Sequence, residues 1–254
     1  MFSEKDNHGL VWETNKGKFS IKEGGKLLDK QYFRNGIAIR DFYLLQKISQ
    51  IYVPDQFNKY VYKAIRVYFY SQQNNSFSME YIQGQNLREL FRETKCSKLF
   101  FHAGYWIGIL HKSSVDSLGN VIVFNDYNRS NIIINIEEKI IVAVDPGEYS
   151  QLKTHPSVSV FIMGYSIIRG ALKENWKTIF PSVKAFYRGY NTTGFNIKYT
   201  LIPGAIYLMK RFAKGISKPA IKKPYFARIF FGLIEVLIVY AVLFTARRHS
   251  NYDY

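Results

Sequence analysis

The chain has 254 residues, enough to bury the core of one large domain or of two lobes. Hydrophobic residues make up 47% of it, which excludes wholesale disorder, and the single cysteine, Cys96, excludes an internal disulfide and fits a reducing compartment. A formal net charge of +16 favours a polyanionic partner: a nucleic acid, an anionic membrane surface or a phosphorylated substrate. The start, MFSEKDNHG, shows no secretory pattern, so we expect a cytoplasmic location.

Two short strands and one helix are predicted for the N-terminal part. Turn signals and alternating polarity place the strands at residues 10–13 and 18–23, with Lys22 on the polar face of the second strand. An apolar period near 3.6 then predicts a helix over residues 36–51, which carries Asp41.

The next segment is predicted to hold two further strands and the start of a helix. Residues 60–70 and 76–82 are rich in Tyr, Phe, Val and Ile, and a polar turn separates them. The second strand continues into the sequence MEYIQG, where a strand end is followed by a glycine, and a helix is expected to start near Leu87.

An apolar stripe predicts a helix over residues 97–113, which contains two histidines. We expect His111 to be a packed structural residue and His102 to be similar, because neither has a Cys or His neighbour at metal-site spacing. The sequence therefore indicates no zinc site. It also lacks the G-x-S-x-G pattern of a hydrolase nucleophile.

The segment VIVFNDYNRSNIIINIEEKIIVAVDPGE contains the densest group of chemically active side chains. Its β-branched runs at residues 132–136 and 139–144 predict a short hairpin. Asp126 and Asn131 precede this hairpin and Asp145 ends its second strand, so the three side chains are expected to lie close together. Phosphoryl transfer needs such a set: one carboxylate to orient a hydroxyl, and an amide with a second carboxylate to hold magnesium.

The D-x-x-x-x-N pattern that starts at Asp126, followed by the hairpin and by D-x-G at Asp145, resembles the catalytic and metal-binding loops of protein-kinase-like phosphotransferases. That superfamily includes protein kinases, aminoglycoside and choline kinases, and the sugar kinases of lipopolysaccharide core assembly. The resemblance implies a bilobal α+β fold. A small antiparallel β-sheet N-lobe with one helix would span residues 1–82, and a larger, mainly helical C-lobe would span residues 83–254.

The resemblance also implies ATP and Mg²⁺ as cofactors, and a role for each matching side chain. Asp126 would accept or orient the proton of the attacking hydroxyl, and Asn131 and Asp145 would hold magnesium. Lys22 matches the lysine that pairs with the α- and β-phosphates. Asp41 matches the acid, on a helix, that anchors this lysine.

A hinge between the lobes is implied by the MEYIQG stretch. There the backbone groups of Glu80 and Ile82 would bond the edge of adenine. The same stretch taken by itself also fits an edge strand that enters a loop.

Several of these assignments have a plainer alternative. Lys18 competes with Lys22, and Asp41 fits an exposed helix carboxylate equally well. Arg129 fits a surface arginine better than a phosphate ligand, and Glu148 fits either a metal neighbour or a loop acid. The family's G-x-G-x-x-G loop is missing.

Beyond the hairpin the sequence predicts helices and a strongly basic character. No Asp or Glu occurs from residue 175 to residue 234, where eleven Lys and Arg fall. The apolar run at residues 229–244 is short for a bilayer span and contains Glu235, so we expect a buried final helix or an interfacial helix, with a true span least favoured. Helices are expected at residues 158–172, 180–190, 202–212 and 225–248, with a basic, proline-containing connector at residues 215–224.

The first functional hypothesis is an ATP-dependent kinase that phosphorylates a hydroxyl of a non-protein acceptor, because no APE-like segment follows Gly147. The basic C-terminal half favours an anionic or lipid-linked sugar, as in a membrane-associated glycolipid or a lipopolysaccharide core, and peripheral binding to the inner face of the cytoplasmic membrane. A small-molecule kinase of the aminoglycoside or choline kinase type is an alternative. A catalytically silent kinase-like binding module is another, and a nucleic-acid binder is disfavoured because no such motif is present.

Overall fold

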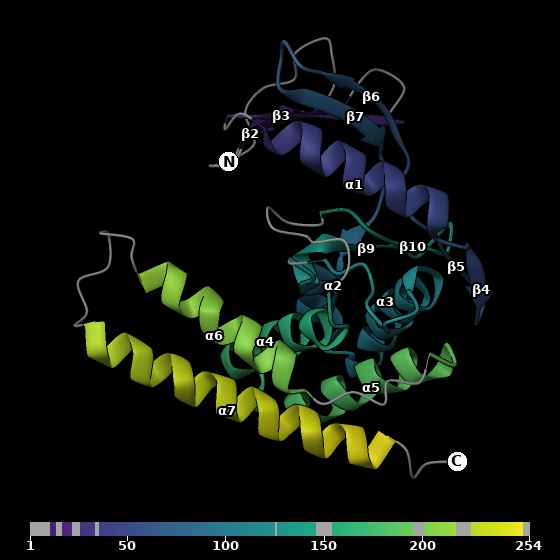
Figure 1. Cartoon of the computed structure of the whole chain (residues 1–254). Coiled ribbons are helices and arrows are strands. Elements are labelled where there is room, and N and C mark those ends of the chain that lie inside the picture. The colour runs from purple at the N-terminus through teal and green to yellow at the C-terminus, as the bar shows by residue number, and fades with distance from the viewer. Residues whose placement is uncertain are drawn as a thin grey trace.

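The structure, a computed structural model, describes residues 11–13, 17–21, 26–33, 36–124, 126–145, 154–195, 201–216 and 225–250. Within these ranges the side chains of residues 11–13, 211–216, 225–231 and 249–250 are not described. Two β-sheets and a set of helices form two lobes, with the smaller lobe at the top of Figure 1.

The small lobe is a five-stranded antiparallel sheet with one helix packed on it (Figure 1). The strand order is β1-β2-β3-β7-β6. Helix α1 contacts the sheet through Phe42, whose ring lies against the rings of Tyr70 and Phe77. The elements are β1 (Val11–Glu13), β2 (Gly17–Ile21), β3 (Leu27–Tyr32), α1 (Ile37–Ile51), β6 (Val67–Ser71) and β7 (Ser76–Glu80).

The first hairpin, α1 and β7 lie where the sequence predicts them, but β3 is a strand that the sequence analysis missed. Its inward face carries Leu28, Lys30 and Tyr32, all of which are buried. A lysine in the middle of that face interrupts the apolar alternation by which a half-buried strand is recognised. This strand lies at the centre of the sheet, between β2 and β7.

A second five-stranded sheet, β4-β5-β10-β9-β8, joins the two lobes. The single strand expected over residues 60–70 is wrong, because the chain leaves β5 after Tyr62 and enters the first sheet only at Val67. Between them, the Lys63 carbonyl accepts a hydrogen bond from Trp106 Nε1 (2.8 Å), which fixes the crossing. The elements are β4 (Asp55–Phe57), β5 (Tyr60–Tyr62), β8 (Gln85–Asn86), β9 (Ile132–Asn135) and β10 (Ile140–Ala143).

Helix α3 (Phe100–Ser114) forms the centre of the large lobe and is buried on nearly every side. It crosses α5 (Ile179–Thr192) at very short range, because Gly104 and Gly108 bring the two backbones together. A Cβ atom at Gly104 would stand 1.9 Å from the carbonyl oxygen of Phe186. Small residues spaced by four therefore set the distance between these two helices.

The remaining helices also follow the prediction, and the expected bilobal α+β architecture, a small antiparallel sheet lobe with one helix and a larger, mainly helical lobe, is confirmed. Helix α2 starts at Leu87, where the side chain of Asn86 caps it by accepting a hydrogen bond from the Glu89 N–H. The helices of the large lobe not yet named are α2 (Leu87–Thr94), α4 (Ser157–Glu174), α6 (Ile202–Ile216) and α7 (Tyr225–Ser250). The lobe boundary at residues 82 and 83 stays a prediction.

The final helix packs on the large lobe along one of its faces. Helix α7 runs beside α5 and α6, on the side of this lobe away from the first sheet (Figure 1). Its buried stripe consists of Val236, Val239, Leu243 and Ala246. Among the described residues, no helix has the length and apolarity that crossing a membrane requires.

Candidate active site

The predicted hairpin is present, and Asn131 ties together the polar groups around it. The side-chain amide of Asn131 donates to the backbone carbonyl of Asp126 (2.8 Å), to the Asp126 carboxylate (3.3 Å) and to the backbone carbonyl of Asp145 (3.5 Å). The Val144 N–H donates to the Asn131 carbonyl (3.0 Å) and locks the end of β10 to the loop. The structure thus brings Asp126, Asn131 and Asp145 together, as the sequence predicts.

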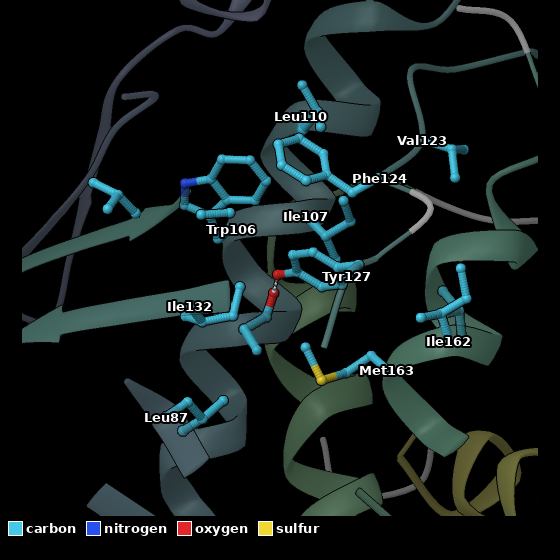
Figure 2. Packing of buried hydrophobic residues seen from close by; sticks show 14 of the residues in the cluster. Leu87, Trp106, Ile107, Leu110, Val123, Phe124, Tyr127, Ile132, Ile162 and Met163 are labelled. Carbon is cyan, nitrogen blue, oxygen red and sulfur yellow. Dashed lines mark hydrogen bonds between the residues drawn. The ribbon is translucent and has the colours of Figure 1, made fainter. Parts of the chain in front are cut away.

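Two buried aromatic residues hold the loop that carries Asp126. Phe124 meets the ring of Trp106 edge-on at 5.3 Å, and Tyr127 stacks on the same indole at 6.0 Å (Figure 2). The Tyr127 hydroxyl donates to the Ala103 carbonyl on α3. Because both neighbours of the segment are fixed to α3, the Asp126 backbone is rigidly placed at the surface of the core.

A lysine and an acid of the small lobe approach this loop from above. Lys30, on β3, is only 6% exposed, and its ammonium donates to the Val144 carbonyl, next to Asp145, at 3.3 Å. Asp41, on α1, is 2% exposed and accepts a hydrogen bond from the Tyr32 hydroxyl at 2.9 Å. Asp41 is thus a buried carboxylate and not an exposed one.

Lys22, the lysine that the sequence analysis selected, lies outside the described residues. Lys18, its competitor, is described and exposed on β2. Lys30 was missed, although two signals were available in the sequence. It stands in a Leu-x-Lys-x-Tyr alternation, and it is much closer in sequence to Asp41 than Lys22 is.

The carboxyl group of Asp41 has an unusual acidity for which the structure gives the cause. Burial raises its pKa to about 6, and the negative charge of Asp145 adds to the rise. The hydrogen bond from Tyr32 and the positive charge of Lys30 act in the opposite direction. The charges of Asp41 and Asp145 therefore interact across the junction between the lobes, and the charge of Lys30 acts on the same carboxyl group.

The hinge stretch leaves β7 at Glu80 and reaches β8 within a few residues. The Glu80 N–H donates to the Arg66 carbonyl (2.8 Å), and its carboxylate accepts from the Lys63 ammonium (2.6 Å). In the described part of the chain the Ile82 N–H has no hydrogen-bond partner. The stretch runs from the first sheet to the second, and its role as a hinge that binds adenine stays a prediction.

Arg129 is buried, so its assignment to the surface is wrong. Its side chain is 6% exposed and lies on α4, with Nη1 3.8 Å from the Glu174 carboxylate. Gly170 makes room for it, since a Cβ atom there would stand 1.8 Å from Nη2. Burial lowers the pKa of the guanidinium, and Glu174 partly restores it. Arg129 therefore joins the loop to α4.

The histidines behave as predicted, and Glu148 lies outside the described residues. His111 is fully buried, and its Nδ1 is 2.6 Å from the Tyr190 hydroxyl, while His102 Nδ1 is 2.6 Å from the Tyr62 hydroxyl. Burial lowers the pKa of His111 to about 3 and that of His102 to about 4, so both are neutral near pH 7. The described residues contain no cluster of three or more His, Cys, Asp or Glu suited to a metal.

Magnesium nevertheless fits the donor set of the loop and hairpin. The ion prefers a few carboxylate or amide oxygens together with phosphate and water oxygens, and it does not need an all-protein cage. The side-chain hydrogen bonds of Asn131 all use its amide nitrogen, and its Oδ1 has no hydrogen-bond partner among the described residues. Asn131 and Asp145 stand at the same end of the hairpin, one before β9 and the other after β10.

Comparison with known proteins identifies no family. No protein-family model and no curated protein matches the sequence. Among solved structures, the chain is similar to the PknI kinase domain of Mycobacterium tuberculosis, with 10% identity, a TM-score of 0.45, and coverage of 77% of this chain and 91% of that one. It is also similar to a Plasmodium kinase domain, with 11% identity, a TM-score of 0.44, and coverage of 95% and 93%. These similarities are too low to support a function, so the proposed function rests on the site alone.

Proposed function

We propose that the protein is an ATP-dependent phosphotransferase that moves the γ-phosphoryl group of ATP to an alcohol oxygen of a non-protein acceptor. The observation that carries this proposal is the meeting of Lys30 and Asp41 of the small lobe with Asp126, Asn131 and Asp145 of the large lobe. Phosphoryl transfer is catalysed mainly by positioning and by electrostatic stabilisation, and this set supplies both.

Each side chain has a distinct part in the proposal. Asp126 accepts or orients the proton of the acceptor hydroxyl, whose oxygen bonds to phosphorus as the bond to the leaving ADP oxygen breaks. Lys30, in place of Lys22, holds the α- and β-phosphates, and Asp41 anchors the region behind it. Asn131 and Asp145 hold Mg²⁺, which when bound neutralises charge on the phosphates.

The hinge would take the adenine. The Ile82 N–H, which has no partner among the described residues, and the backbone of Glu80 would bond the base edge. Because these are backbone groups, side-chain substitutions at the two positions should change nucleotide affinity little. The Lys63–Glu80 ion pair then serves to fix the end of β7.

For the acceptor we propose a sugar hydroxyl of an anionic or lipid-linked glycan, such as a membrane-associated glycolipid or lipopolysaccharide core. The support is the sequence from residue 175 to residue 234, which has eleven cations and no carboxylate. Such a composition suits an anionic acceptor. It does not suit the cationic acceptors of aminoglycoside kinases. The alternative to a lipid-linked glycan is a soluble small-molecule acceptor.

A specific observation favours a second candidate, a kinase-like module that binds nucleotide without turnover. Lys30 and Asp41 form no ion pair in the described structure. The lysine bonds to the Val144 carbonyl, and the aspartate accepts a hydrogen bond from Tyr32 and lies 3.5 Å from the Arg40 guanidinium. Aspartate is one methylene shorter than the glutamate of the family's pair. The enzyme therefore needs a small closing movement of α1 that the silent module would lack.

The test is transfer of labelled γ-phosphate, with Mg²⁺, to three acceptor classes: a glycolipid extract, soluble sugars and proteins. We expect transfer to the glycolipid, and a loss of about a hundredfold in Lys30→Met but not in the exposed control Lys18→Met. Transfer only to soluble sugars would move the acceptor to the small-molecule class. Nucleotide binding without transfer to any class would establish the silent module.

A further inference from the structure

Helix α7 has an exposed face that is apolar over most of its described length. Leu233, Leu237, Ala241 and Phe244 are spaced by four, four and three residues, so they share one face of the helix. All four are exposed, and Leu237 and Phe244 are 66% and 43% exposed. Ile238, at 47%, widens the same face.

The charged side chains that are described on α7 do not interrupt this face. Among its described side chains, the one carboxylate is that of Glu235, and it accepts a hydrogen bond from the Tyr165 hydroxyl of α4 at 3.0 Å. Arg247 lies near α5: burial raises the pKa of Tyr187 on that helix, and the positive charge of Arg247 opposes the rise. Arg248 stands at the end of the exposed face with its guanidinium 5.0 Å from the centre of the Phe244 ring. A carboxylate that would oppose lipid contact is thus turned into the protein.

The neighbouring helix α6 repeats the arrangement. Ile202, Ile206 and Met209 are 53%, 46% and 41% exposed, and their spacing places them on one face, with exposed Lys210 beside them. Gly204 and Leu208 lie on its buried side. Helices α6 and α7 are in contact and form the outer layer of the large lobe (Figure 1). We call the exposed residues of the two helices the α6–α7 face.

The described cations beside this face are Lys210, Arg247 and Arg248, and the sequence around them is basic. From residue 175 to residue 234 the chain has no Asp or Glu, and Arg247 and Arg248 follow at the far end of α7. A second copy of the chain would bring the same cations together without a carboxylate to pair with them. An anionic lipid surface offers both a complement to the cations and an apolar layer for the exposed side chains.

We propose that the α6–α7 face is a docking surface for an anionic lipid bilayer, with the apolar side chains inserted at the level of the headgroups and the flanking Lys and Arg on lipid phosphates. The helices lie along the surface and do not cross it. This inference concerns binding and does not depend on the proposed transfer reaction.

The test is flotation of the full chain with vesicles of phosphatidylcholine containing phosphatidylglycerol, compared with vesicles of phosphatidylcholine alone. We expect binding to the anionic vesicles and weakening by added salt. Leu237→Glu should reduce partitioning by about tenfold or more, since it replaces an inserted leucine with a charge. Leu118→Glu is the matched control, because Leu118 is an equally apolar, 83% exposed residue on a loop outside this face.

Several outcomes would overturn the proposal. Equal binding to neutral and anionic vesicles would remove the role of charge, and unchanged binding of Leu237→Glu would remove the role of α7. If the wild-type chain ignores vesicles but forms a dimer that Leu237→Glu dissociates, the face joins two copies instead. Leu237→Ser repeats the test with a smaller change should the glutamate variant fail to fold. Flotation needs no turnover, so its failure leaves the transfer reaction untouched.

Discussion

Replacing Asp41 with asparagine should make the protein more stable near neutral pH and less active. The buried carboxyl has a pKa raised to about 6 from an ordinary value of 3.8, first by burial and then by Asp145. A carboxyl whose pKa is higher in the folded state contributes stability at low pH, and that contribution is lost as pH rises through the folded-state pKa. Asparagine keeps the hydrogen bond from Tyr32 and removes the titration.

The magnitude follows from the two pKa values. A pKa change of one unit corresponds to about 1.4 kcal/mol, and integration of the proton linkage from about pH 4.5 to about pH 7.5 gives roughly 2 kcal/mol. The free energy of unfolding of Asp41→Asn, minus that of the wild type, should therefore become more positive by this amount across the interval. Titrating groups that do not interact with Asp41 behave alike in both proteins and cancel in the difference.

The assay is urea unfolding of both proteins at several pH values, without nucleotide and with a chelator present. Transfer activity of the same preparations should be lower in the variant, because the negative charge behind Lys30 is lost. A difference in stability that does not change with pH, or that changes in the opposite direction, would show that Asp41 is not a buried carboxylate held against Asp145.

Two further substitutions test the packing that positions the loop. Gly104→Ala should lower the free energy of unfolding by roughly 1–3 kcal/mol in urea denaturation, because its Cβ would stand 1.9 Å from the Phe186 carbonyl oxygen, and a neutral or stabilising effect would contradict the close crossing of α3 and α5. Gly170→Ala should displace the guanidinium of Arg129 from Glu174. The free energy of unfolding should fall by roughly 3 kcal/mol for the broken buried pair, and transfer activity should fall with it. Unchanged stability in thermal unfolding would show that the pair contributes nothing.

The helices of the large lobe were predictable because each has a long apolar stripe and a clear ending. Helix α3 and helix α5 begin and end within a few residues of the predicted bounds. The β9–β10 hairpin was predictable for a similar reason, since two β-branched runs flank a short acidic turn. Local pattern decides structure where the buried face is continuous and apolar.

The contacts that residues make with distant parts of the chain were not predictable from the sequence. Lys30 lies on the buried face of β3 because its ammonium reaches the Val144 carbonyl, which belongs to the hairpin of the other lobe. Arg129 is buried because Gly170 leaves space for it and Glu174 faces it, both on α4. The expected strand over residues 60–70 divides because Trp106, on α3, donates a hydrogen bond to the Lys63 carbonyl in its middle. Such partners are visible only after folding.

The central claim is that Asp126 serves phosphoryl transfer at a site built by both lobes. The most direct test is the rate of γ-phosphate transfer by wild-type protein and by Asp126→Asn, with ATP affinity measured on the same preparations. We predict a loss of transfer of about a hundredfold or more with nearly unchanged ATP affinity, because the side chain acts on the acceptor hydroxyl and not on the nucleotide. Transfer at the wild-type rate by the variant would contradict the account.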